Sequence, residues 1–189
     1  MRYLLYSVFV LGWALITIIS VTSTIHAEET YRYERDLGFL TVLMMPSEVP
    51  LTNHKETNQY CGGDCHWLYP PGILPAKSWK AIISKLNTHF GEKVELSSDL
   101  IQNIEKYLVN NAGEVTYSST SVKILDGIAD NQTPLSVFAS KSIKRKHHKI
   151  DNEIYARQSI KNSTNCPACH IGVKESGDFD EHDVEIPER

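Results

Sequence analysis

The apolar residues of the chain follow three patterns. Residues 4–21 form an almost uninterrupted apolar run, broken only by Ser, Thr and Gly. Residues 78–90 and 99–110 instead place apolar side chains at the three- and four-residue spacing of a helix with one buried face. Residues 114–132 are polar and irregular, which indicates a loop or a segment wrapped around a cofactor. No segment has the clear alternation of a half-buried strand. The pattern predicts a small, single-domain, mainly α fold with much irregular structure.

The two periodic segments carry helix signals at their ends. In the first, Ser78 is expected to be the N-cap and Gly91 the C-terminal stop. Its apolar stripe consists of Trp79, Ile82, Ile83, Leu86 and Phe90. The second helix is expected over about residues 99–110, behind Ser98 as its cap. A further segment of helical character, residues 141–149, is basic.

The N-terminal apolar run has the features of an export signal. A positive start, Met1-Arg2, precedes it, and Ala27 is a small residue at the position where signal peptidase would cut. We interpret residues 1–27 as a signal peptide and residues 28–189 as one modest domain, exported to the periplasm. The run is also nearly long enough to span a bilayer, so an uncleaved N-terminal anchor stays open, and the membrane is a partner only in that case.

The charge of the chain makes nucleic acid an unexpected partner. It has 19 basic and 23 acidic residues, for a formal net charge of −4. The basic segment is the local exception, with Lys141, Lys144, Arg145, Lys146 and Lys149. A solvated helix face and a docking patch both fit this cluster.

Four cysteines form two close pairs, and a histidine directly follows each pair. Cys166 and Cys169, with His170, make the C-x-x-C-H run by which c-type haem is attached. In this chemistry the thiols add to the porphyrin vinyl groups and the imidazole becomes the proximal iron ligand. Two disulfides, a zinc site or a redox dithiol would use the same cysteines. The disulfides and the zinc site must both explain why a histidine directly follows each pair.

The first pair has the same parts with a longer spacer. Three residues separate Cys61 from Cys65, and His66 follows. Two of the three are Gly62 and Gly63, which let an extra residue bulge at low conformational cost. We predict a second attached haem here, with His66 as its proximal ligand. A missing thioether bond or a disulfide between the two cysteines is the alternative.

Two proximal histidines leave two iron faces without a ligand. His89 lies three residues after Leu86, at or beside the apolar stripe, where an imidazole needs a partner. For His89, a satisfied core histidine is the alternative to iron ligation. His147 and His148 lie upstream of the second motif, and neighbouring helical positions point about 100° apart, so one of them can ligate while the other faces solvent. His54 is a reserve candidate.

Together these residues resemble the dihaem cytochrome c family, usually called DHC, over about residues 60–187. The matching motifs are Tyr69-Pro70-Pro71-Gly72, Leu74-Pro75, Ser78-Trp79, His89-Phe90-Gly91, Tyr107-Leu108, Thr133-Pro134-Leu135, Asn165 with the second Cys-His motif, and Gly177-Asp178-Phe179. The chain departs from the family in the three-residue spacer of the first motif and in Ile143, where an aromatic residue is common.

The resemblance implies two covalent haem c groups, each with two histidine ligands. It gives proximal roles to His66 and His170 and distal roles to His89 and His147, preferring His147 to His148. It also implies an electron-transfer protein rather than an enzyme. Other redox proteins would be its partners, including a small oxygen-binding monohaem cytochrome c and membrane b-type cytochromes. A peroxidase-like haem enzyme or gas sensor is the alternative if one iron lacks its distal histidine.

Overall fold

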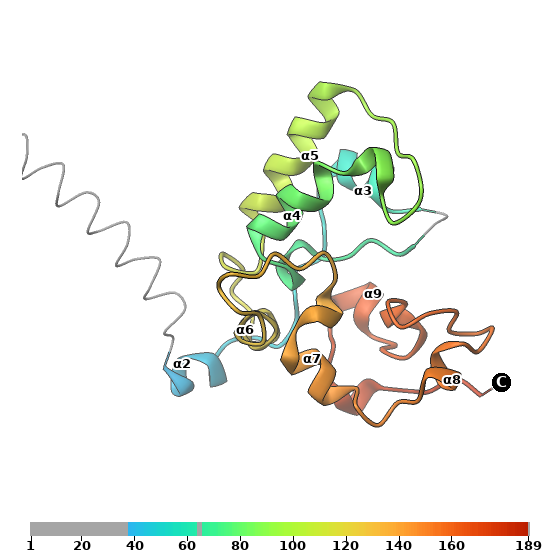
Figure 1. Ribbon diagram of the computed structural model, residues 1–189. Coiled ribbons are helices and arrows are strands. Elements are labelled where there is room, and N and C mark those ends of the chain that lie inside the picture. The colour runs from blue at the N-terminus through green and yellow to red at the C-terminus, as the bar shows by residue number, and fades with distance from the viewer. Residues whose placement is uncertain (1–37, 64–65, 189) are drawn as a thin grey trace, which may run out of the picture. The chain divides into compact units, whose positions relative to one another are not determined.

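The computed structural model of the chain describes residues 38–63 and 66–188 (Figure 1). The predicted signal peptide and Cys65 lie outside these residues. The compact unit that begins at Leu40 holds every element from α3 onward. Its described part is helical without a strand, apart from isolated antiparallel bridges between His89 and Glu92 and between His170 and Val184. The predicted mainly α fold with much irregular structure is therefore confirmed.

The helices are short and joined by long irregular segments. The α-helices are α2 (Phe39–Leu43), α3 (Lys55–Cys61), α4 (Ala76–Ile83), α5 (Ser98–Asn110), α6 (Ser119–Asp126), α7 (Lys141–Lys146), α8 (Asn152–Tyr155) and α9 (Val173–Ser176). The 3-10 turns are η1 (Pro71–Ile73), η2 (Leu86–Thr88), η3 (Val137–Ala139), η4 (Cys166–Ala168) and η5 (Glu181–Asp183). In the described part of the chain, no helix has the length and apolar character needed to cross a bilayer.

The main core lies where α4 packs along α5, as Figure 1 shows. Ile82 and Ile83 of α4 and Ile104 and Leu108 of α5 are buried. Each fully buried aliphatic side chain of this kind contributes about 1.5–3 kcal/mol to folding. The Trp79 indole Nε1 donates to the carbonyl of Pro71 at 2.8 Å and so fixes the start of α4 against η1.

The helix predicted over residues 78–90 is wrong in both its start and its length. It begins at Ala76, behind Pro75, and ends at Ile83, while η2 follows as a separate turn. The Leu86 carbonyl, which a continued helix would pair with the amide of Phe90, accepts instead from the Val94 amide at 2.9 Å. The returning chain thus takes the hydrogen bond that the helix would need.

The helix predicted over residues 99–110 is confirmed within one residue. It begins at Ser98, and its cap is Ser97, whose hydroxyl accepts from the Leu100 amide at 3.4 Å. The apolar residues at helical spacing face the core as expected.

The expectation that residues 114–132 form only loop is wrong, because α6 lies within them. Ser and Thr are modest helix formers, which hid the helix from the pattern. Tertiary hydrogen bonds stabilise it: Ser118 donates to the carbonyl of Ser47 at 3.2 Å, and Ser140 donates to that of Ile124 at 2.8 Å. A Cβ at Gly127 would lie 2.2 Å from the Ser140 hydroxyl, so only glycine permits this close approach.

Candidate functional site

The first candidate site brings His66 and His89 together. Their ring centroids lie 6.2 Å apart, with 35° between the ring planes. His66 follows the first cysteine motif. His89 ends η2, just before Phe90 and Gly91, which both have positive φ, at 50° and 100°. His89 therefore reaches His66 from a tight turn and not, as the sequence had predicted, from the face of a helix.

The ring nitrogens of the first site favour a free Nε2. A carbonyl oxygen can only accept, so the 2.7 Å contact between His66 Nδ1 and the Trp67 carbonyl places the proton on Nδ1. The lone pair then lies on Nε2. Burial, and next the charge of His66, lower the pKa of His89 below its ordinary value. Both effects favour the neutral imidazole, which is the form that binds metals.

The second candidate site brings His147 and His170 together in the same way. Their ring centroids are 6.1 Å apart, with 56° between the planes. His147 is the C-cap of α7, and its Nδ1 donates to the carbonyl of Ile143 at 2.9 Å, which again leaves Nε2 free. Burial, and next the charge of His147, lower the pKa of His170, while Asp178 opposes the shift.

The second motif forms one tight turn around its thiols. η4 covers Cys166–Ala168, and the His170 amide donates to the carbonyl of Cys166 at 2.9 Å, so both cysteines and the histidine share a single short loop. Burial raises the pKa of Cys166 to about 12 and raises that of Cys169 as well. Both thiols are free. A thiol with so high a pKa yields little thiolate, which disfavours a redox dithiol.

In the described part of the first motif, the cysteine thiol is likewise free and has a raised pKa. Cys61 ends α3 as a free thiol, and burial raises its pKa. No group of three or more His, Cys, Asp or Glu side chains that could hold a metal is present among the residues described. A structural zinc site uses four such ligands, so these residues do not form one.

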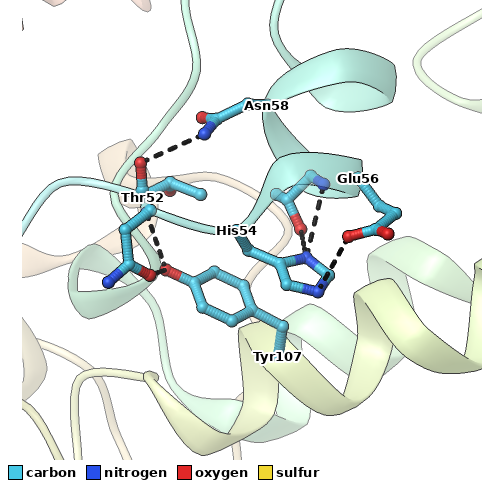
Figure 2. A network of polar contacts seen from close by, with 7 residues as sticks. Thr52, His54, Glu56, Asn58 and Tyr107 are labelled. Atoms are coloured by element: carbon cyan, nitrogen blue, oxygen red, sulfur yellow. Dashed lines mark hydrogen bonds and ion pairs between the residues drawn. The ribbon is translucent and has the colours of Figure 1, made fainter.

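The other histidines in the described part of the chain have other partners or face solvent. His54 caps α3: its Nδ1 accepts from the amide of Thr57 at 3.4 Å and contacts the Thr57 hydroxyl at 2.9 Å. Its Nε2 lies 3.2 Å from Glu56, and its ring stacks on Tyr107 at 4.5 Å (Figure 2). His148 is exposed and bonds through Nδ1 to the carbonyl of Arg145 at 2.7 Å.

A junction of aromatic residues joins the two sites. The Tyr69 hydroxyl and the Trp67 indole both donate to the carbonyl of Thr164, at 2.9 and 3.4 Å. Thr164 lies two residues before the second motif. Ring contacts continue across the junction, from His66 to Tyr69 at 5.2 Å, from Trp67 to Phe179 at 6.3 Å and from Phe179 to His170 at 5.7 Å.

This junction was missing from the sequence-based prediction. Its only local signal is the pair of aromatic residues shortly after the first Cys-His, since the carbonyl that they share lies 97 residues beyond Trp67 and 95 beyond Tyr69.

Two buried polar atoms near the second candidate site are the Tyr155 hydroxyl and His170 Nδ1. Neither has a hydrogen-bond partner among the described residues. An unsatisfied buried donor costs about 1–3 kcal/mol, so a partner from outside the chain would stabilise both. Burial, and next the charges of Cys169 and Cys166, raise the pKa of Tyr155, consistent with a hydroxyl beside the second motif.

Comparisons with known proteins agree on one family. The model of the dihaem cytochrome c family matches residues 57–179. A diheme cytochrome c from Rhodobacter sphaeroides is similar, with 32% sequence identity and a TM-score of 0.57 over 66% of this chain and 95% of that one. The diheme cytochrome c of Shewanella baltica OS155 is 28% identical, with a TM-score of 0.56 over 72% of this chain and 95% of its own. A search of curated proteins found no match.

Proposed function

Because this chain belongs to the dihaem cytochrome c family and has two haem c cofactors, we propose that it is an exported one-electron carrier in which two histidines hold each iron. The observation that carries this proposal is the spacing of the two histidine pairs. An imidazole nitrogen binds a metal at about 2.0–2.1 Å, and the ring centroid lies about 1.1 Å behind it, so two imidazoles that hold one metal from opposite sides would have centroids about 6.2–6.4 Å apart. The observed separations are 6.2 and 6.1 Å. The stacked rings of His54 and Tyr107, by contrast, are 4.5 Å apart.

The residues that would hold each haem follow from this pairing. Cys61 and Cys65 would attach the first and Cys166 and Cys169 the second. His66 and His89 would hold one iron, and His147 and His170 would hold the other. A haem also brings carboxylate acceptors, which would suit the unpartnered Tyr155 hydroxyl.

The chain's own hydrogen bonds would tune these ligands. When bound between two histidines, a haem iron exchanges one electron between its ferric and ferrous states and has no open position for oxygen or peroxide. The Nδ1 protons of His66 and His147 are held by backbone carbonyls, which orients the rings and raises their basicity. Greater basicity favours the ferric state, so these two bonds would lower the reduction potentials.

The proposed setting is the periplasm, where other redox proteins would be the partners. The resemblance to the family suggests a small oxygen-binding monohaem cytochrome c and a membrane b-type cytochrome. The apolar N-terminal run supports export, as does the location typical of c-type cytochromes.

An absorption spectrum tests the ligation directly. The purified haem-loaded protein would be measured reduced and oxidised, with and without carbon monoxide. Sharp c-type bands that carbon monoxide leaves unchanged are expected, because neither iron would have a replaceable ligand. A carbon monoxide shift in the parent protein would instead favour an enzyme or gas sensor with an open iron, and the absence of c-type bands would contradict haem attachment.

A further inference from the structure

The outer surface of α7 concentrates positive charge on a net acidic chain. Residues 141–149 hold five of the 19 basic residues and none of the 23 acidic ones. All five of these cations are exposed. Lys146 pairs with Glu181 at 2.5 Å. The side chains of Lys141, Lys144, Arg145 and Lys149, called the basic face below, have no ion pair among the residues that the structure describes.

The same helix carries a proposed iron ligand on its other side. Ile143 packs against the core, and the His147 ring contacts Phe138 at 5.4 Å and His170 at 6.1 Å. Lys141, Lys144 and Arg145 follow the three- and four-residue spacing of a common face, turned to solvent. A helix with its side chains is about 10–12 Å across, so the basic face lies about one helix width from the second histidine pair.

Helix stability explains only part of this charge. Cations in the last turn interact favourably with the helix dipole, which accounts for Lys144, Arg145 and Lys146. Lys141 stands at the first helical position, where a positive charge is unfavourable, and Lys149 lies beyond the helix. Like charges three and four residues apart also repel each other. The helix dipole therefore does not account for Lys141 and Lys149.

We propose that the basic face is the docking surface for an acidic redox protein that exchanges electrons with the second haem. This inference rests on the proposed function, which supplies the electron-carrying site behind the helix. A cationic face on an otherwise acidic surface orients an approaching anionic partner and speeds their encounter. In the exchange, one electron leaves the reduced partner and the ferric iron accepts it, with no bond made or broken.

The test uses flavodoxin, a small acidic redox protein, as the probe. Reduced flavodoxin is mixed with the oxidised haem-loaded chain, and the second-order rate is followed by stopped flow over a range of salt concentrations. The K144E/R145E variant is compared with K80E/K106E, which changes the same charge at exposed positions of α4 and α5. At low salt we expect K144E/R145E to react about tenfold more slowly than the control, and at about 1 M salt we expect the difference to vanish. The neutral K144Q/R145Q variant should give an intermediate rate.

A readout that does not depend on electron transfer accompanies the rates. Backbone amide signals of residues 141–149 should shift when oxidised flavodoxin is added at low salt, and K144E/R145E should abolish the shifts. Equal rates for K144E/R145E and the control would overturn the proposal. Vesicles of anionic phospholipid that bind the parent chain but not K144E/R145E, without flavodoxin shifts, would identify a membrane surface instead. Self-association lost in that variant alone, again without flavodoxin shifts, would identify a second copy of the chain.

Failure of this inference is distinguishable from failure of the proposed function. The absorption spectrum of each variant, with and without carbon monoxide, reports the iron ligands, whereas the salt-dependent rates and amide shifts report docking. An unchanged low-spin spectrum with unaltered rates would reject only the docking surface. A carbon monoxide shift in the parent chain would reject only the ligation.

Discussion

At the scale of single residues, the hydrogen bonds of the ring nitrogens distinguish the candidate ligands His66 and His147 from the helix cap His54. His66 and His147 give their Nδ1 protons to carbonyls and keep Nε2 free, while both nitrogens of His54 have protein partners. The cysteine motifs were predictable because the chemistry of attachment sets their spacing. For the histidine pairs, proximity along the chain favours His66 with His89 and His147 with His170 but leaves a crossed arrangement open, since only the fold brings the rings together.

Replacing a distal histidine tests the pairing. In H89A or H147A, both haems should remain attached, because the thioether bonds depend on cysteines, but one iron should lose its sixth ligand. Roughly half of the haem should then turn high-spin and bind carbon monoxide. Visible spectroscopy with carbon monoxide checks this, with H148A and H182A as controls that should keep the parent spectrum. If H89A and H147A keep it too, the assigned ligands are wrong.

Acid should release the distal ligand of the first site only well below neutrality. Burial, and then His66, lower the pKa of His89 below its ordinary 6.5, and iron binding would lower it further because it requires the neutral ring. With its folded pKa depressed, neutral His89 contributes stability that is fully present above pH 6.5 and is lost as the pH falls through the folded pKa. A spectrophotometric titration should therefore keep the low-spin band at pH 6. Its loss between pH 7 and 6 would contradict the expectation.

At the scale of elements, the sequence predicted helices whose stability is local and missed those that depend on distant partners. α5 has its own cap and an apolar stripe, and it was found within one residue. α6 is held by hydrogen bonds from Ser118 to Ser47 and from Ser140 to Ile124, which no local pattern reveals. The helix expected up to Phe90 ends at Ile83, and the Leu86 carbonyl that a longer helix would use pairs instead with the distant Val94 amide.

The cap of α3 gives a prediction at this scale. H54A removes the acceptor for the Thr57 amide and the stack on Tyr107, and loss of such a cap costs about 0.5–2 kcal/mol. Thermal unfolding should therefore shift down by several degrees, while the low-spin spectrum stays unchanged. H54D keeps a capping oxygen without the ring, so its unfolding temperature should lie between those of H54A and the parent. A high-spin signal in H54A would instead make His54 an iron ligand.

At the scale of the whole molecule, the two candidate sites are joined through one backbone carbonyl. Trp67 and Tyr69 follow the first motif and both donate to Thr164, which precedes the second. The two proposed haem sites are thus neighbours across a shared hydrogen-bonded junction, an arrangement that neither motif indicates by itself.

Removing one hydroxyl from this junction should weaken the link between the sites. Y69F loses the bond to Thr164, worth about 0.5–1.5 kcal/mol, and should alter the separation between the two reduction potentials in a redox titration. Y107F is the matched control, since its hydroxyl contacts Asn53 away from the junction. It should leave the potentials unchanged. Potentials in Y69F identical to those of the parent would show that the bond does not affect the haems.

The distribution of the core predicts how the chain responds to loss of the second haem. Most of the buried apolar side chains lie between Met45 and Ile128, whereas after residue 140 only Ile160 and Val173 are buried among the described hydrophobic residues. Two such side chains are too small a core to order residues 141–188, so this region should depend on its attached haem. In C166A/C169A, hydrogen exchange should become fast throughout α7, α8 and α9, while α4 and α5 remain protected.

The matched control, C61A, should leave α8 and α9 protected because it alters only the first motif. Full protection of residues 141–188 in C166A/C169A would mean that the polypeptide alone orders this region, and uniform loss of protection would mean that the first core also requires the second haem.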